Sequence, residues 1–177
     1  MKKIIALGAS NSKNSINQKF AIFVASKIKN TQTVSIKLSE YDLPLYGIDY
    51  ENKNGIPEAA QQLNDIIASS HGIVISFAEH NGNYTAAFKS AFDWLSRIDK
   101  NVWKDKPMLL LATSPGGRGG KTVLELAKNS FPRFAGTIIA DFSLPSFQDN
   151  FKENRITNEE LNLELNSKIQ SFQQHIK

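Results

Sequence analysis

Short apolar runs alternate along the chain with longer stretches in which apolar residues recur every three or four positions. The short runs have the length and composition of strands, and the longer periodic stretches are typical of amphipathic helices. The predicted strands are residues 3–8, 32–38, 72–77, 107–113 and 137–142. The predicted helices are residues 15–29, a segment beginning at Pro57, 85–98, 121–131 and a C-terminal segment after Thr157. Five strands alternating with helices predict an α/β protein with one parallel sheet covered by helices on both faces.

Local start signals support several of these helices. Ser15 and Gln18 form an S-x-x-Q capping box at the start of the first helix. Pro57 suits the first position of the second helix, because its missing N–H would be unpaired there anyway. Thr157 and Glu160 form a second capping box, which predicts the start of the C-terminal helix.

Two connections carry weaker signals. Residues 39–56 contain Pro, Gly and Asn, which predict a long irregular segment. Residues 146–156 show neither the apolar period of a helix nor that of a strand. They fit either a linker or a lid over a neighbouring site.

Three polar loops each follow a strand and enter a helix: residues 8–15, 78–84 and 114–120. All three are rich in Gly, Ser, Asn or Thr. In a parallel sheet these loops meet at the carboxyl ends of the strands, where such folds bind their ligands. Their shared composition therefore predicts one binding site at that edge.

The amino-acid composition narrows the classes of protein that this sequence can belong to. The chain has 177 residues, which suits a single domain over residues 1–177. It has no cysteine, which excludes disulfides, thiolate catalysis and cysteine-ligated metal centres, and its three histidines are too scattered to suggest a metal site. No apolar run reaches the length of a membrane span, so we expect a soluble cytoplasmic protein. The net charge of +4 arises from scattered basic residues, with no run that predicts a nucleic-acid partner.

The first loop has the chemistry of a phosphate cradle. Backbone amides at a helix N-terminus attract anions, and hydroxyl or amide side chains add further donors. Capping of the helix accounts for Ser15 alone and leaves Ser10, Ser12 and Asn17 without a structural explanation. The pattern G-x-G-x-x-G is absent after the first strand, which argues against a Rossmann dinucleotide site.

The other two loops are individually less specific. Glu79, His80, Asn81 and Gly82 suit edge-on hydrogen bonding to a flat heterocycle, although an ordinary polar turn has the same composition. The sequence of the third loop and the two residues after it, SPGGRGGKT, nearly matches the P-loop motif. That motif needs a glycine five residues before Gly120, and this chain has Pro115 there. We therefore expect a flexible loop whose amides face the rim of a ring.

Together the loops resemble those of the NADPH-dependent FMN reductase family, flavodoxin-like enzymes that include quinone, azo-dye and chromate reductases. The resemblance covers about residues 3 to 145. The family's first loop, G-S-x-R-x-x-S-x-N, corresponds to residues 9–17, with Ser12 in place of the Arg and Lys13 beside it. Its second signature, P-E-Y-N-G-S followed by L-K-N-A-x-D-W, corresponds to residues 78–83 and 88–94, with Ala78 and His80 replacing the Pro and Tyr. The third, S-P-G-G-x-G-G, is present as residues 114–120, and DLPLY resembles the family's connection after the second strand.

The resemblance implies a flavodoxin-like three-layer sandwich with strand order 2-1-3-4-5 and a non-covalently bound FMN. It implies that the FMN phosphate lies in the first loop and the isoalloxazine between the second and third. The implied cofactor-binding residues are Ser10, Ser12, Ser15, Ile16, Asn17, Glu79, His80, Asn81, Gly82, Ser114, Gly116 and Gly117. A homodimer or homotetramer is also implied, with Trp94 packing within the protein or at a subunit contact and Lys89 on the helix surface.

The implied activity is a ping-pong oxidoreduction. NADPH or NADH passes a hydride to the flavin, and a small-molecule acceptor then takes the electrons: a quinone, an azo compound, a metal oxyanion or free flavin. The flavin carries the chemistry, so no side chain is needed as a catalytic residue. Amides near Gly116 and Gly117 are candidates to stabilise the charge of the reduced ring, with Arg118 a weaker one. Two other classes stay open: a flavodoxin-like electron carrier and a scaffold that binds no flavin.

Overall fold

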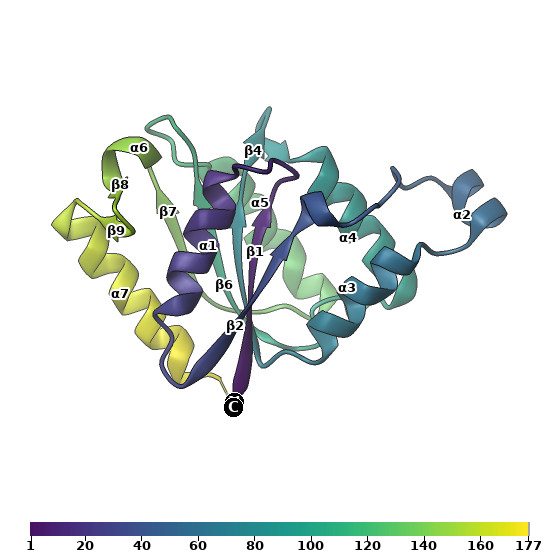
Figure 1. Cartoon of the computed structure of the whole chain (residues 1–177), viewed down its shortest axis with the longest axis horizontal. Coiled ribbons are helices and arrows are strands. Elements are labelled where there is room, and N and C mark those ends of the chain that lie inside the picture. The colour runs from purple at the N-terminus through teal and green to yellow at the C-terminus, as the bar shows by residue number, and fades with distance from the viewer. Residues whose placement is uncertain (177) are drawn as a thin grey trace.

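A computed structural model describes residues 1–176 and places five parallel strands in a central sheet (Figure 1). The strands are β1 (Lys2–Ala9), β2 (Thr31–Lys37), β3 (Gly72–Phe77), β6 (Pro107–Thr113) and β7 (Thr137–Leu144). Their order is β2-β1-β3-β6-β7, which confirms the predicted order 2-1-3-4-5. Every residue of β3 is buried, as expected of an apolar run covered on both faces.

Helices cover both faces of the sheet, as predicted (Figure 1). On one face lie α1 (Ile16–Ser26) and α7 (Glu159–Gln174), and on the other lie α3 (Glu58–Ala68), α4 (Ala86–Ile98) and α5 (Lys121–Ser130). Side chains that alternate along each strand divide between two hydrophobic clusters. Ile4 and Ala6 of β1, for example, pack toward α1 and α7, whereas Ile5 and Leu7 pack toward α3 and α4.

The connection 39–56 is more regular than the sequence predicted. It begins within a short 3₁₀ helix, η1 (Leu38–Glu40), and contains a two-turn helix, α2 (Ile48–Asn54). None of the residues of α2 is buried, and the helix stands away from the body of the protein (Figure 1). Gly47 and Gly55 flank it, and Asp49 and Glu51 in its first turn complement the helix dipole. The prediction of an irregular segment was wrong here, because a helix this short carries too few apolar positions to show a period.

Two predicted helix starts shift by one residue. Pro57 is the N-cap of α3 rather than its first residue. The cap of α7 is Asn158, whose side chain accepts a hydrogen bond from the N–H of Leu161 at 3.0 Å. Thr157 instead donates its hydroxyl to the carbonyl of Asp149 at 2.9 Å, so the predicted capping box with Glu160 was wrong.

Residues 146–156 belong to the folded body and do not form a linker. They make a short helix, α6 (Phe147–Asn150), and a hairpin of β8 (Phe151–Lys152) and β9 (Arg155–Ile156). The ring of Phe151 lies 4.9 Å from that of Phe147 and 5.0 Å from that of Phe23 on α1. The segment therefore extends the hydrophobic cluster between α1 and α7.

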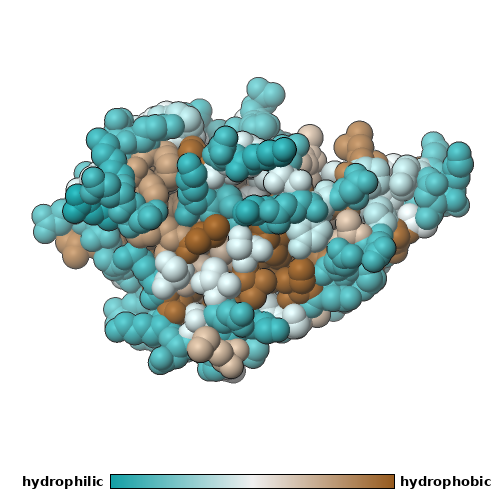
Figure 2. Space-filling model, in the orientation of Figure 1, coloured by the Kyte–Doolittle hydropathy of each residue, from teal (hydrophilic) through white to brown (hydrophobic). Residues whose placement is uncertain are grey.

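The surface is mainly polar on the face seen in Figure 2. Hydrophobic side chains gather there near the edge strand β2, between α1 and α3. Among residues 1–176, no helix combines the length and apolarity needed to cross a bilayer.

Candidate functional site

A pocket of about 260 Å³ lies at the carboxyl ends of β1, β3 and β6, where the three polar loops meet. The predicted residues that line it are Ser10, Ser12, Ser15, Ile16, Asn17, Glu79, His80 and Ser114. The predicted residues Asn81, Gly82, Gly116 and Gly117 are outside its lining. Asn14, Ala78, Thr113 and Pro115 also line it and were not selected from the sequence, although each lies within or beside a polar loop.

The N-terminus of α1 opens into this pocket. The Ser15 hydroxyl accepts a hydrogen bond from the N–H of Gln18 at 3.1 Å and so caps the third residue of the helix. The N–H groups of Ile16 and Asn17 have no acceptor within the helix, because the first turn of any helix leaves its donors free. Both residues line the pocket. The end of the helix therefore offers two backbone donors and the positive end of its dipole to an anion.

Two serine hydroxyls shape the loop ahead of α1. The hydroxyl of Ser10 accepts from the N–H of Ser12 at 3.1 Å, and that of Ser12 accepts from the N–H of Asn14 at 3.3 Å. A hydroxyl that accepts one bond still has its own proton to donate. Both serines can thus hold the loop in shape and donate to a ligand at the same time.

Gln18 does not complete the predicted capping box. Its side-chain oxygen accepts from the N–H of Gly8 at 2.6 Å, and its amide nitrogen donates to the carbonyl of Ala6 at 3.2 Å. The N–H of Ser15 donates to Ser12 instead. A Cβ on Gly8 would lie 2.4 Å from the backbone nitrogen of Gln18, so the close approach of β1 and α1 requires glycine at this position.

The side chain of Asn17 ties α1 to the sheet. It is 2% exposed, and its oxygen accepts from the N–H of Thr113 at 3.1 Å and from the hydroxyl of Ser76 at 2.6 Å. Its amide nitrogen donates to the carbonyl of Thr113 at 3.1 Å. With both ends of the amide engaged, the backbone N–H of Asn17 is the part that faces a ligand.

The predicted second loop is a tight β-hairpin. Its strands are β4 (Glu79–His80) and β5 (Asn83–Tyr84), joined by Asn81 and Gly82 with φ values of +53° and +74°. Two consecutive left-handed residues make the type I′ turn that Asn-Gly favours, which is the sequence signal that predicts this hairpin. The turn directs His80, which is exposed, to the pocket rim.

Glu79 has a structural partner. Its carboxylate accepts from the backbone N–H of Val123 at 2.9 Å, in the first turn of α5. The N-cap of α5 is Gly120, which has no side chain to offer. Glu79 therefore caps α5 from a different element and holds the hairpin against the third loop.

The third loop does not form a P-loop. The N–H of Gly119 donates to the carbonyl of Gly116 and that of Lys121 to the carbonyl of Arg118, each at 3.2 Å. These two tight turns use amides that a P-loop would direct at phosphate. Gly116 and Gly117 remain exposed, with nothing within 4 Å of a Cβ added at either.

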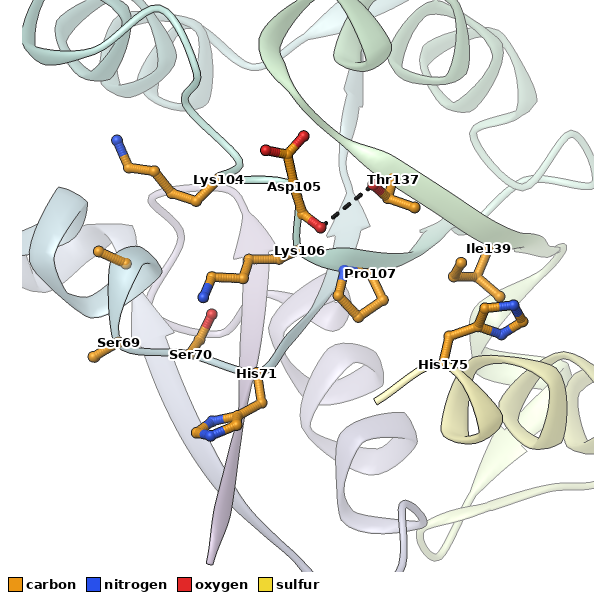
Figure 3. Close-up of a pocket in the computed structure, with 11 residues that line it drawn as sticks. Ser69, Ser70, His71, Lys104, Asp105, Lys106, Pro107, Thr137, Ile139 and His175 are labelled. Carbon is orange, nitrogen blue, oxygen red and sulfur yellow. Dashed lines mark hydrogen bonds between the residues drawn. The ribbon is translucent and has the colours of Figure 1, made fainter. Parts of the chain in front are cut away.

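Helix polarity makes this edge of the sheet favourable for anions. The N-termini of α1, α4 and α5 all point toward it, since each helix follows a strand that ends there. A larger hollow of about 560 Å³ lies at the opposite end, around Pro107, His71 and His175 (Figure 3). It lies beside the C-termini of α3 and α7, whose dipoles disfavour anions, and Lys104 and Lys106 offset that field. Helix polarity therefore favours anion binding in the smaller pocket.

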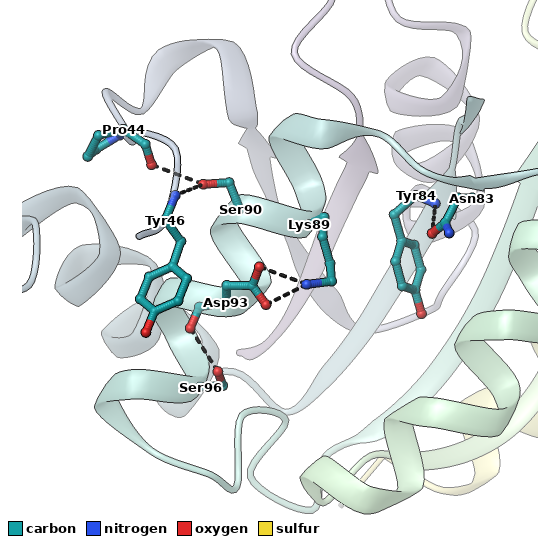
Figure 4. Close-up of polar contacts among 8 residues, drawn as sticks. All are labelled: Pro44, Tyr46, Asn83, Tyr84, Lys89, Ser90, Asp93 and Ser96. Carbon is teal, nitrogen blue, oxygen red and sulfur yellow. Dashed lines mark hydrogen bonds and ion pairs between the residues drawn. The ribbon is translucent and has the colours of Figure 1, made fainter. Parts of the chain in front are cut away.

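The helix after the hairpin anchors the 39–56 connection (Figure 4). The carbonyl of Pro44 accepts from the hydroxyl of Ser90 at 2.9 Å and from the indole N–H of Trp94 at 2.8 Å, and the N–H of Tyr46 donates to Ser90 at 3.0 Å. Trp94 is fully buried and packs edge-on against Tyr46. Lys89 is exposed and pairs with Asp93, as expected of a surface residue.

The strand order, the helices on both faces and the polar site at the carboxyl edge define a flavodoxin-like protein. The fold matches that of FerB, a flavoenzyme NAD(P)H:acceptor oxidoreductase from Paracoccus denitrificans, with a TM-score of 0.76 at 23% identity over 99% of each chain. It also matches a flavodoxin from Pseudomonas aeruginosa, with a TM-score of 0.56 at 10% identity over 99% of each chain. At these identities the matches establish the fold alone.

Sequence comparison establishes the family. Residues 2–149 match the model of the NADPH-dependent FMN reductase family, and the chain belongs to that family. It is 30% identical to the quinone reductase of Escherichia coli K12 over 118 residues, which are 67% of this chain and 63% of that relative. The matched part thus spans less than two thirds of that relative's length. Among the described residues, no group of three or more His, Asp or Glu side chains is placed to hold a metal ion.

Proposed function

We propose that this chain is an FMN-dependent NAD(P)H oxidoreductase that acts on small-molecule acceptors of the quinone type. The observation that carries the proposal is the pocket at the N-terminus of α1, where backbone N–H groups and serine hydroxyls converge at the carboxyl edge of the sheet. Family membership supports the same assignment.

The pocket residues fit a phosphate monoester. The N–H groups of Ile16 and Asn17 and the hydroxyls of Ser10 and Ser12 supply donors from one loop and one helix end. Among the described residues that line the pocket there is no Lys or Arg; its charged or titratable side chains are Glu79, which caps α5, and His80. Neutral donors and the α1 dipole would therefore hold the phosphate, in place of the arginine that Ser12 replaces.

The adjoining loops would hold the flavin ring. Ala78, just before the β4–β5 hairpin, and His80 within it line the pocket together with Ser114 and Pro115 of the third loop, so backbone groups of both loops would be available to the ring. Gly116 and Gly117 lie just beyond Pro115 in the same loop, and because they carry no side chains their amides would be free to approach the ring, where reduction would build negative charge. FMN, when bound, supplies the acceptance of hydride from a nicotinamide and the delivery of electrons to an acceptor.

We infer that NAD(P)H and the acceptor use the same open face in turn. The pocket is a shallow surface site rather than an enclosed cavity, and its outer rim is formed by exposed loop residues. One shared face would impose a ping-pong cycle, because the oxidised nicotinamide would have to leave before an acceptor could stack. The name of the Escherichia coli relative favours a quinone as acceptor over an azo compound, a metal oxyanion or free flavin.

We also propose that two copies associate through the segment from Leu45 to Ile56. Leu45, Ile48, Tyr50 and Ile56 are 77%, 53%, 41% and 40% exposed, and they account for most of the large hydrophobic side chains that are exposed on the described residues. Exposed apolar residues gathered on one protruding segment favour a protein–protein contact.

The visible absorbance spectrum tests the central proposal. The purified protein is incubated with FMN, desalted, and then mixed with NADPH or NADH without oxygen. Flavin bands that remain with the protein and bleach on addition of nucleotide support the reductase, and turnover with a quinone panel then identifies the acceptor. Retention without bleaching favours an electron carrier, and a protein that retains no flavin favours a scaffold.

A further inference from the structure

Two basic side chains at the end of the third loop and the start of α5 have no ion-pair partner among the described residues. Arg118 and Lys121 are exposed, and neither forms an ion pair with any of the described residues. Arg97, by contrast, pairs with Glu51 at 3.0 Å. Since Arg118 and Lys121 lie three residues apart across the start of α5, they place two positive charges at one corner of the third loop.

Arg118 is held beside the second loop. One guanidinium nitrogen donates to the hydroxyl of Thr122 at 2.6 Å, which leaves the remaining donors of the fork free. The methyl group of Thr122 lies 3.8 Å from a Cβ placed on Gly82. Through Thr122, Arg118 is therefore tied to a residue that lies beside the β4–β5 hairpin turn, and both Arg118 and Thr122 are outside the lining of the pocket.

The position of this charge suits a ligand other than FMN. The one phosphate of FMN is accounted for at the N-terminus of α1, whose lining contains neither Arg118 nor Lys121. A nicotinamide that stacks on the flavin must bring its adenosine half across the outer rim of the site. NADPH carries a phosphate on the adenosine ribose where NADH has a hydroxyl, and an arginine fork is suited to bind such a phosphate through two parallel hydrogen bonds.

We propose that Arg118, with Lys121 beside it, binds the 2′-phosphate of NADPH and makes this chain prefer NADPH to NADH. The inference rests on the proposed function, because the nicotinamide half must reach a flavin in the adjoining pocket. It assigns the discrimination to two side chains of the third loop and the first turn of α5.

The first experiment measures nucleotide fragments, so that it does not depend on flavin chemistry. Binding of 2′,5′-ADP and of 5′-AMP is titrated by calorimetry or amide chemical shifts in the wild type, Arg118→Gln, Arg118→Lys and Arg133→Gln. Arg133 is an exposed arginine on η2 (Phe131–Phe134), beyond the far end of α5, so its replacement makes the same change in net charge away from the site.

We expect the wild type to bind 2′,5′-ADP more tightly than 5′-AMP. In Arg118→Gln the ratio of the two affinities should fall by about tenfold or more. A loss of this size is expected when one charge-assisted hydrogen-bonded pair is removed. Arg118→Lys should retain part of this advantage, because lysine keeps the positive charge but lacks the paired donors of the guanidinium. Arg133→Gln should retain all of the advantage. Equal binding of the two fragments by the wild type, or an equal loss in Arg133→Gln, would overturn the inference.

A second experiment measures kcat/KM of the flavin-loaded protein with NADPH and NADH. The ratio of kcat/KM for NADPH to kcat/KM for NADH should drop in Arg118→Gln, through a rise in KM for NADPH, and should stay at the wild-type value in Arg133→Gln. Equal use of both nucleotides by the wild type would reject the Arg118 assignment and leave the reductase proposal intact. Failure to retain FMN would reject the reductase proposal, and the fragment titration would still decide whether Arg118 recognises the 2′-phosphate.

Discussion

The carboxylate of Glu79, at the start of the β4–β5 hairpin, accepts a hydrogen bond from the backbone N–H of Val123 at 2.9 Å. Glu79 belongs to the second polar loop and Val123 to the helix that follows the third, and 44 positions separate them. One side chain thereby closes the first turn of α5 and fixes the spacing of two loops that border the candidate flavin site. The contact explains an acidic residue in a pocket proposed for an anionic cofactor.

Replacing Glu79 with Ala should destabilise the protein and weaken FMN binding together. Loss of a helix cap costs about 1 kcal/mol, and α5 has no other side chain at its N-cap. Urea denaturation and FMN titration of Glu79→Ala measure the two effects. Glu79→Gln is the matched control, since its amide oxygen still accepts from Val123. Equal FMN affinity in Glu79→Ala and the wild type would contradict the link between this cap and the site.

Asn17→Ala should reduce stability more than any single change on the exposed rim of the pocket. The substitution leaves the N–H of Thr113 and the hydroxyl of Ser76 without their acceptor inside the protein. Two orphaned buried groups cost about 2 to 4 kcal/mol in the free energy of unfolding. Chemical denaturation measures it, with Asn14→Ala, an exposed pocket residue, as the control. A loss below that of Asn14→Ala would show that Asn17 does not join α1 to the sheet.

The double substitution of Leu45 and Ile48 with Ser should convert a dimer into a monomer. Both side chains are largely exposed, so the fold of the single chain does not depend on them. Light scattering coupled to size-exclusion chromatography gives the mass of each form, and circular dichroism confirms that helix content is unchanged. Leu163→Ser removes an exposed leucine from α7, on the other face of the sheet, and serves as the control. A wild type that stays monomeric at micromolar concentration would rule out association through this segment.

Tyr84→Phe should make the free energy of unfolding decline less steeply as the pH rises in the alkaline range. Burial raises the pKa of the Tyr84 phenol above its ordinary value of 10.0. The unfolded chain therefore releases this proton first, so the stability associated with Tyr84 is complete below about pH 10 and declines as pH rises toward the folded pKa. Loss of the hydrogen bond to Ser130 should cost about 1 kcal/mol at neutral pH.

Urea midpoints between pH 8 and 11 measure the slope for Tyr84→Phe and the wild type. Because burial also raises the pKa of Tyr41, the wild-type decline should be reduced rather than abolished. Tyr50→Phe, at an exposed position, is the control substitution. Identical slopes in Tyr84→Phe and the wild type would exclude Tyr84 as a source of the alkaline loss.

The sequence was enough to predict the order of strands and helices, because a buried parallel strand and an amphipathic helix each repeat a pattern over many residues. It also predicted that three loops meet at one edge, since parallel strands leave no other arrangement. Short elements escaped prediction: α2 has seven residues and the β4–β5 hairpin has two residues in each strand. Such segments contain too few positions for a period to appear, although Asn81-Gly82 carried a turn signal.

Residue types in the loops determined what chemistry this protein can offer, namely hydroxyls, amides and glycines at a helix N-terminus. The tertiary structure alone decided which of those groups line the pocket. Asn17 and Glu79 were both predicted to bind the cofactor; both line the pocket, and their side chains also join elements that are distant in sequence. A polar side chain binds whichever donor or acceptor the fold brings within about 3 Å. The sequence lists the polar groups, and the packing of the helices on the sheet selects their partners.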